Sequence, residues 1–453
     1  MAASSIRSPE SPARNGSPVR DHSRILKSIP LSRPLRTAIA GIGGFGSAHH
    51  GVFARLESRG VTRVIATCDP ALDRLGDICQ THRFDERGVE TFKVFEDMLD
   101  AHPASLDLGV IAAPIPLHAP MHEAFVEKGI ACYLEKPPTL DPREFQRMLA
   151  VEKRAHLPTN VGFAYVHLQD RLDLKRRMMT GEFGALKRLS FLGLARRGPA
   201  YFQRSGWAGR LMLGDSLVLD SCLGNAMAHF LNNLLFFADQ TTLQGWARPS
   251  EMACELYRAN PIEGTDTIFA LARLENGIEL RIAASHACPN ESELFEETLE
   301  FEDATITICS STKVAIQRPG APVETFSIAG ASLGRCVENY CGFLTGDGSR
   351  PAQTLQDCLG FVETNALLYL AGKQIHDIPA RILKNSGTES IISLPDVEIA
   401  ARRLISEATL PSEAGFRWAA PGGECGVEAI PNLHESIRHM LGLQKDISPG
   451  HSV

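Results

Sequence analysis

The stretch that decides the fold is residues 36–46, RTAIAGIGGFG. Its first five residues have the apolar, β-branched character of a short buried strand. Gly41, Gly43 and Gly46 follow in G-x-G-x-x-G spacing, and residues 47–59 then have the pattern of a helix. In a strand–turn–helix unit of this kind, the first glycine permits a tight turn, the second lets the backbone approach a pyrophosphate, and the third permits close helix–strand packing.

Asp69 lies at the end of the second predicted strand, where a dinucleotide-binding unit usually has an acidic residue. A second apolar run, residues 63–68, ends at Asp69, whose side chain can accept hydrogen bonds from ribose hydroxyls and would repel a 2′-phosphate. The sequence therefore predicts NAD as the cofactor, while the nearby Arg74 leaves NADP open. The residues predicted to hold the dinucleotide here are Gly41, Gly43, Phe45, Gly46 and Asp69.

Further strand-like runs cover residues 106–113 and 130–134, with a helical pattern at 118–128 between them. Strands that alternate with helices indicate right-handed βαβ units and a doubly wound parallel sheet, the Rossmann type of α/β fold. Ligands bind at the carboxyl ends of such strands. The residues at these ends are Pro114 and His118 after one run, and Glu135 and Lys136 after the next. Taken alone, Lys136 would be interpreted as a solvated surface lysine.

The chain of 453 residues is too long for one ordinary core. After about residue 158, strand-like segments recur without alternating helices, which predicts an α+β domain with a large, mostly antiparallel open sheet. The predicted organisation is a disordered arm (1–34), a dinucleotide-binding domain (35–158), a substrate and oligomerisation domain (159–380) and a C-terminal extension (381–453).

Charge and composition give no indication of a nucleic acid, membrane or zinc partner. The net charge of −7 gives no electrostatic reason to expect nucleic acid or an anionic membrane, and no apolar run approaches the roughly 18 residues of a membrane span. The 11 cysteines form no CxxC pair, so a reducing, cytoplasmic location and no zinc site are expected. The adjacent His49 and His50 cannot face one metal ion from a single helix face.

The GIGGFG turn, the strand end at Asp69, the proline loop with His118 and above all Leu134-Glu135-Lys136-Pro137 resemble the Gfo/Idh/MocA family of dinucleotide-dependent oxidoreductases. GEFG at residues 181–184 resembles the family's turn before its second-domain sheet, so the resemblance runs from about residue 35 to about 375. It implies that Lys136 and a D-x-x-x-H pair on a second-domain helix handle a sugar, a cyclitol or a related polyol. It also implies a homodimer or homotetramer, formed through the exposed face of the sheet.

The sequence departs from the family pattern at the helical pair. His229 is present, but the residue four positions before it is Asn225 and not Asp. On one helix, Asn225 and His229 would share a face, whereas Asp220 has the wrong spacing for that face. The expected roles are His229 as general base, with its ordinary pKa near 6.5, Asn225 as its polar neighbour and Lys136 as the stabiliser of the alkoxide. Without the family, His229 would be interpreted as a core histidine.

Residues 195–210, which precede this region, are rich in both aromatic and basic side chains. His286 lies at the end of a later predicted strand. Aromatic and guanidinium groups can bind a polyol or an acidic sugar, although a structured loop packed on its own domain is an equal alternative. The predicted substrate residues are Tyr201, Arg204, Trp207 and His286.

These observations predict hydride transfer between a secondary alcohol carbon of a sugar or polyol and a nicotinamide. Two alternatives stay open. One is a glycosidase that uses NAD for transient oxidation. The other is a non-catalytic dinucleotide-binding regulator, and the replacement of the family's aspartate by Asn225 is compatible with this alternative.

Overall fold

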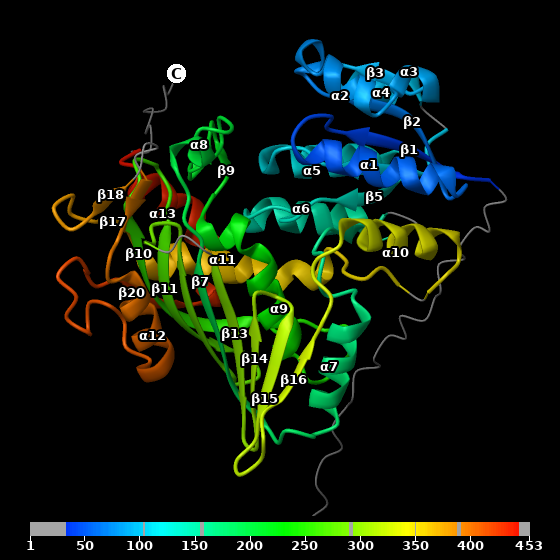
Figure 1. The fold of residues 1–453 in the computed structure, drawn as a ribbon. Helices are drawn as coiled ribbons and strands as arrows, with labels where there is room; N and C mark the ends of the chain where they lie inside the picture. The colour runs from blue at the N-terminus through cyan, green and yellow to red at the C-terminus, as the bar shows by residue number, and fades with distance from the viewer. Residues whose placement is uncertain are drawn as a thin grey trace, which may run out of the picture.

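A computed structural model describes residues 33–102, 105–154, 158–289, 293–348, 350–386 and 391–443 (Figure 1). The predicted arm therefore lies almost wholly outside the described residues. Within these ranges, no helix is both long and apolar enough to span a bilayer.

The first domain contains the predicted parallel sheet, in the order β3-β2-β1-β4-β5-β6. β1 lies between β2 and β4, so the connections leave it in opposite directions and a crevice opens at the carboxyl ends of β1 and β4. The strands are β1 (Leu35–Ala40), β2 (Thr62–Cys68), β3 (Glu90–Phe92), β4 (Leu108–Ile111), β5 (Ala131–Leu134) and β6 (Asn160–Val161).

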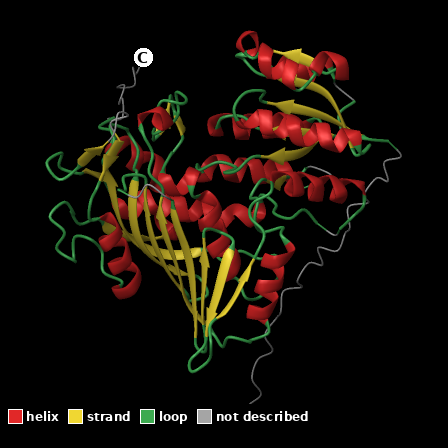
Figure 2. Cartoon of the chain, in the orientation of Figure 1, coloured by secondary structure: helices red, strands yellow, loops and turns green. Residues whose placement is uncertain are grey.

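Helices cover both faces of this sheet (Figure 2). They are α1 (Phe45–Ser58), α2 (Gly76–Thr81), α3 (Phe84–Arg87), α4 (Phe95–Ala101), α5 (His118–Glu127) and α6 (Pro142–Glu152). β1 and β4 are almost entirely buried, as expected of central parallel strands with helices on both sides.

The second domain is a ten-stranded sheet in the order β16-β15-β14-β13-β7-β12-β11-β10-β17, with β20 also paired to β10. Its pairs are antiparallel except for β7 with β12 and β10 with β17, which confirms the predicted α+β class. The strands are β7 (Leu186–Leu194), β10 (Pro249–Arg258), β11 (Thr267–Leu274), β12 (Glu279–Ser285), β13 (Leu294–Phe301), β14 (Thr305–Cys309), β15 (Lys313–Gln317), β16 (Glu324–Ser327), β17 (Ile375–Asp377) and β20 (Gly423–Gly426).

The inner face of this sheet is covered by α9 (Ala228–Ala238) and α11 (Leu359–Gly372), which belong to the main apolar core. α7 (Gln169–Met179) flanks the β13–β16 end (Figure 1). α10 (Leu333–Thr345) returns to the first domain and packs against α1, where Tyr340 and Val337 join its core. The two domains therefore share apolar contacts outside the crevice.

The C-terminal extension lies on the outer face of the same sheet. α12 (Val397–Glu407) and Trp418 bury apolar side chains against β7, β10, β11 and β12. Farther along, His434 at the start of α13 (Leu433–Met440) places Nε2 2.7 Å from Oδ2 of Asp141, which caps α6 of the first domain. The extension thus reaches from the outside of the sheet back to the Rossmann domain.

Candidate active site

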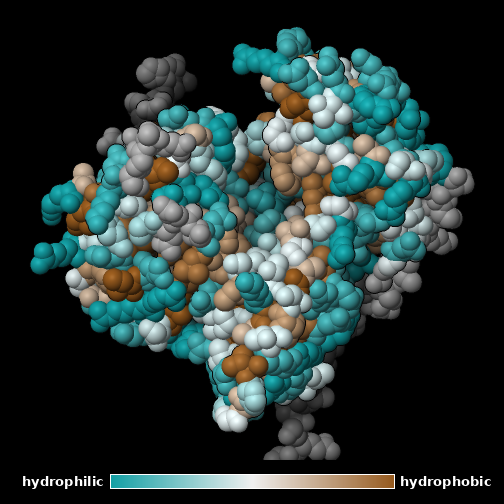
Figure 3. All heavy atoms as spheres, in the orientation of Figure 1, coloured by the Kyte–Doolittle hydropathy of each residue, from teal (hydrophilic) through white to brown (hydrophobic). Residues whose placement is uncertain are grey.

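A cavity of about 540 Å³ lies between the domains and corresponds to the notch at the top of the space-filling view (Figure 3). The glycine turn and the carboxyl ends of β4 and β5 form one side, and residues 201–226 form the other. Predicted site residues that the structure brings together on its wall are Gly43, Phe45, Pro114, His118, Glu135, Lys136, Tyr201, Arg204, Trp207 and Asn225.

The glycine turn fits a dinucleotide. A Cβ on Gly41, whose φ is +114°, would lie 2.4 Å from the carbonyl oxygen of Ala112, and one on Gly46 would lie 2.5 Å from that of Gly41. Gly44, with φ of +53°, has no heavy atom within 4 Å of the position of a Cβ, so an open cradle stands before the N-terminus of α1. Amide groups at such a terminus bind phosphate oxygens.

Asp69 lies directly beside this turn. Its Oδ2 accepts the backbone N–H groups of Ile42 and Gly43 at 3.0 and 3.1 Å, and its Oδ1 accepts that of Ala71 at 2.9 Å. These bonds fix the carboxylate at the end of β2, and Oδ1, which accepts one bond, keeps a lone pair for a ribose hydroxyl. The position agrees with the predicted role in ribose recognition.

His118, which the sequence predicts to contact the cofactor, lies on the cavity wall and also connects two loops. Its ring is buried, with Nε2 2.8 Å from the carbonyl oxygen of Ala113 and Nδ1 2.8 Å from that of Pro137. Both ring nitrogens therefore lie against backbone carbonyl oxygens, and the neutral ring can donate its one N–H to either of them. His118 joins the loops that follow β4 and β5, which places Pro114 and Lys136 on the same wall.

Lys136 reaches from the end of β5 into the cavity. Its Nζ donates to the carbonyl oxygen of Asn225 at 3.3 Å, and the Lys136–Pro137 peptide is cis. Burial lowers the pKa of the ammonium below its usual value of 10.5, while the carboxylates of Glu135 and Asp220 oppose the change. A lysine whose pKa is lowered in this way can exchange a proton closer to neutral pH.

The predicted helical pair is not on one helix. Residues Cys222–Ala226 form a π-helical turn, and α9 begins only at Ala228, so the expectation that Asn225 and His229 share one helix face is wrong. Asn225 points elsewhere: its Nδ2 donates to Oδ1 of Asp220 at 2.9 Å. The extra residue of a π-turn shifts the register, which the i, i+4 spacing could not reveal.

Asp220, excluded by its sequence spacing, is the carboxylate that the structure places beside Asn225 and Arg204. It is buried, its Oδ2 accepts the N–H of Gly209 at 2.6 Å, and Arg204 Nη2 lies 3.8 Å from the same oxygen. Burial raises its pKa, against hydrogen bonds and nearby cations that lower it. The preceding Leu219 has φ of +49°, a strained conformation that is characteristic of functional turns.

His229, at the start of α9, is half-buried and is not among the residues that line this cavity. Its ring packs edge-on against Phe163 and Tyr165, with centroid distances of 5.8 and 5.4 Å, and its buried Nδ1 has no partner among the described residues. Burial, with added repulsion from Lys136 and Arg171, holds the pKa of His229 well below its ordinary value. The imidazole is neutral at physiological pH, so the assumed pKa near 6.5 is wrong for this environment.

The aromatic and basic segment forms the opposite wall. The guanidinium of Arg204 lies over the ring of Tyr201 at 3.9 Å and near that of Trp207 at 4.9 Å. His286 does not line the cavity: its Nδ1 lies 2.7 Å from the carbonyl oxygen of Ala195, and its ring supports Tyr201 from behind at 5.4 Å. Burial lowers the pKa of His286 to about 3.

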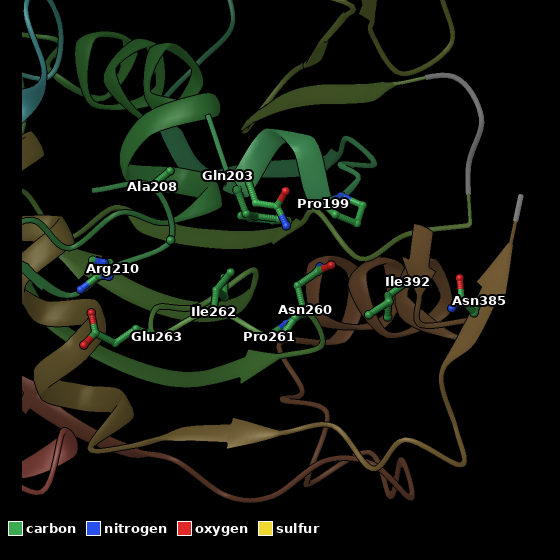
Figure 4. Close-up of a pocket in the computed structure, with 12 residues that line it drawn as sticks. Pro199, Gln203, Ala208, Arg210, Asn260, Pro261, Ile262, Glu263, Asn385 and Ile392 are labelled. Carbon is green, nitrogen blue, oxygen red and sulfur yellow. The ribbon is translucent and has the colours of Figure 1, made fainter. Parts of the chain in front are cut away.

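A second cavity, of about 610 Å³, lies on the other side of the same segment (Figure 4). Its wall combines the segment around Gln203 and Arg210 with the loop Asn260–Glu263 and with Asn385 and Ile392 of the extension. Gly209 connects the two cavities, because its N–H is bonded to Asp220 and its carbonyl oxygen accepts the N–H of Gly264 at 2.7 Å.

Comparison with known proteins agrees with this geometry. The sequence model of the Gfo/Idh/MocA oxidoreductase family, described as an NAD-binding Rossmann fold, matches residues 35–163. Inositol 2-dehydrogenase 4 of Saccharopolyspora erythraea is 30% identical over 189 residues, which are 41% of this chain and 52% of the relative. Inositol 2-dehydrogenase of Corynebacterium glutamicum is 27% identical over 193 residues, with 42% and 52% covered. The chain thus spans about half the length of the curated relatives it matches.

Solved structures show the same fold over more of the chain. The WlbA dehydrogenase from Bordetella pertussis, solved in complex with NADH and UDP-GlcNAcA, superposes with a TM-score of 0.62 at 18% identity, covering 75% of this chain and 96% of its own. UDP-N-acetylglucosamine 3-dehydrogenase GnnA from Acidithiobacillus ferrooxidans gives a TM-score of 0.59 at 17% identity, with 74% and 97% covered. Residues 35–163 of the chain match the NAD-binding Rossmann domain of the Gfo/Idh/MocA oxidoreductase family.

Proposed function

We propose that the chain is an NAD-dependent oxidoreductase that transfers hydride between a secondary alcohol of a sugar, cyclitol or related polyol and the nicotinamide. The observation that carries the proposal is the position of Lys136, whose ammonium lies on the same cavity wall as the glycine turn and faces Asn225 across it. A binding module without turnover has no need of a buried lysine at this place.

The charges of the site favour a neutral substrate. Two cations, Lys136 and Arg204, are balanced by two carboxylates, Glu135 and Asp220, all in or beside the cavity. Aromatic rings and a carboxamide supply the remaining contacts, which suits the C–H faces and hydroxyls of a polyol. Both curated relatives bear the name inositol 2-dehydrogenase, which supports a cyclitol as the first compound to test.

In the oxidation direction, Lys136 in its neutral form accepts the hydroxyl proton, because its lowered pKa makes that form accessible. Asp220 and Asn225, joined by a hydrogen bond, orient the segment whose carbonyl oxygen faces the lysine. NAD, held by the glycine turn and Asp69, would supply the hydride acceptor for the carbon that carries this hydroxyl group.

The test has two stages. Fluorescence titration with NADH and NADPH should show tighter binding of NADH, and myo-inositol with related polyols should reduce NAD in the presence of wild-type protein but not of Lys136→Met. Binding of NADH with no turnover of any polyol would favour the regulator. Net cleavage of a glycoside without accumulation of NADH would favour the glycosidase.

A further inference from the structure

The C-terminal extension contacts the loop that carries Lys136. This loop, residues 136–141, joins the end of β5 to α6 and finishes at Asp141, whose Oδ1 accepts the backbone N–H of Arg143 at 2.8 Å and caps the helix. Oδ2 of the same carboxylate lies 2.7 Å from Nε2 of His434 on α13, and since a carboxylate oxygen accepts, the ring nitrogen donates. Asp141 is 3% exposed, so the bond is largely shielded from water. The carboxylate therefore divides its two oxygens between its own domain and the extension.

The helix that carries His434 is anchored in the second domain. Leu433 and Ile437 of α13 are buried in the main apolar core, where α13 packs against α11. A second, exposed bond runs beside the first, from Nη2 of Arg143 to the carbonyl oxygen of Pro431 at 3.0 Å. The extension is thus fixed to one domain and holds the first turn of a helix of the other.

The same loop meets the second domain again at the cavity. Nζ of Lys136 donates to the carbonyl oxygen of Asn225 at 3.3 Å. Leu140 is fully buried, and a Cβ added to Gly224 in the π-helical turn would lie 3.0 Å from its Cδ1, so the two segments are in close contact. In its own domain the loop is held near its start by the ring of His118. The extension therefore restrains the far end of a loop whose near end places the proposed acid–base group.

We propose that His434 is a positioning residue: its bond to Asp141 holds the loop of residues 136–141 against the π-helical turn and so keeps Lys136 beside Asn225 at the cavity. Without His434, Oδ1 of Asp141 still accepts the N–H of Arg143, so α6 stays capped and only the restraint on the loop is lost. The inference rests on the proposed role of Lys136 in proton transfer. The restraint itself exists whether or not a substrate is converted, so it can be measured separately.

The first measurement is amide hydrogen exchange in the full chain. The amides of Asp141, Arg143 and Phe145 report on this turn, because they donate to Oγ1 of Thr139, to Oδ1 of Asp141 and to the carbonyl oxygen of Asp141. We expect His434→Ala to accelerate their exchange roughly two- to tenfold, the usual contribution of one hydrogen bond, and to leave the amides of β1 and β4 unchanged. His434→Gln keeps an N–H donor on a side chain of similar reach and should restore most of the protection.

The second measurement separates turnover from cofactor binding. His434→Ala should lower kcat for polyol oxidation by a similar factor, roughly two- to tenfold, and leave NADH affinity unchanged, because the glycine turn and Asp69 lie at the ends of other strands. His439→Ala is the matched control, since it removes an exposed imidazole from the same helix and should change neither exchange nor kcat.

Three results would overturn the proposal: unchanged exchange in His434→Ala, no recovery of protection in His434→Gln, or faster exchange with kcat at the wild-type value. If the wild-type protein converts no polyol while the exchange rates change as expected, the proposed function is wrong and the restraint by His434 stands.

Discussion

Lys136 is the side chain on which the proposed chemistry depends most directly. We expect Lys136→Met to reduce kcat for polyol oxidation by roughly 10²–10⁴-fold, the usual contribution of a positioned acid–base group. NADH affinity should change little, because the phosphates and ribose are held by the glycine turn and Asp69. Steady-state rates and fluorescence titration of the same preparation separate the two effects, and an equal loss in both would contradict the assignment.

Asp69 is expected to determine the preference for NADH. Asp69→Ala removes the acceptors for the ribose hydroxyls and for the N–H groups of Ile42 and Gly43, so NADH affinity should fall about tenfold or more. Asp69→Asn keeps one acceptor and should lose less. Affinity for NADPH should fall less than that for NADH in both variants, since a carboxylate repels the 2′-phosphate.

Buried histidines make stability depend on pH. Burial lowers the pKa of His50 to about 3, of His122 to about 4 and of His286 to about 3. The unfolded chain takes up these protons near pH 6.5, so each residue stabilises the fold fully above that pH and less as the pH falls towards the folded value. The free energy of unfolding in urea should fall by up to roughly 1.4 kcal/mol per pH unit for each histidine below pH 6.5. A flat profile from pH 6.5 to 5 would contradict this.

The difference between predicted and missed residues has a physical reason. Gly41 and Asp69 could be placed from the sequence because each belongs to a local strand–turn–helix pattern, whereas Lys136 could be placed only through the family resemblance of its motif. Asp220 could not, because its position depends on a strained turn and on a bond to Gly209, and the π-turn interrupts the periodicity that linked Asn225 to His229. His434 gave no signal, because its partner Asp141 lies 293 positions away in the chain.

Among the elements, the turn from β1 to α1 has the least room for change. Gly46→Ala would place a Cβ 2.5 Å from the carbonyl oxygen of Gly41, so α1 must move away from β1. We expect a loss of roughly 1–3 kcal/mol in stability and a large loss of NADH affinity. Gly60→Ala, at the other end of α1, meets no atom within 4 Å and should cost only about 1 kcal/mol, because its φ is +72°. Thermal unfolding of both variants tests the contrast.

The strands of the first domain could be predicted from the sequence, because strands that follow one another along the chain alternate there with helices. The parallel strands follow one another through short crossovers, and their apolar runs identify them. The edge of the second sheet could not be predicted, because β10 pairs with β20, a four-residue strand with two glycines that has no strand-like pattern. Only the tertiary contacts of the extension make this segment a strand.

At the scale of the molecule, the extension changes the expected assembly. The resemblance implied pairing of subunits through the open sheet face, but α12 and Trp418 already cover that face over β7, β10, β11 and β12. Glu255 and Tyr257 hold the covering segment: Glu255 accepts the N–H of Ser412 at 3.2 Å, and Tyr257 donates to the carbonyl oxygen of Ala420 at 3.0 Å. The large exposed apolar side chains of the described residues are few and belong to different elements.

We therefore expect a monomer of 49.3 kDa in light scattering. Trp418→Ala should cost about 3–5 kcal/mol, expose the segment around residue 418 to proteases and promote self-association through the uncovered face. A wild-type dimer whose mass is unaffected by Trp418→Ala would show that subunits pair elsewhere, such as on the polar strands β13–β16.

The pairing of β20 with β10 also has a consequence for biosynthesis. The six strands of the Rossmann sheet are synthesised by residue 161, whereas the Glu251–Cys254 part of β10 gains its second neighbour, β20, only after residue 426 has left the ribosome. At the usual 5–20 residues per second, that interval lasts roughly 8–34 seconds. During this time the outer face and the free edge of the sheet are open to wrong partners, so the nascent second domain should be the stage at which chaperones matter most for yield.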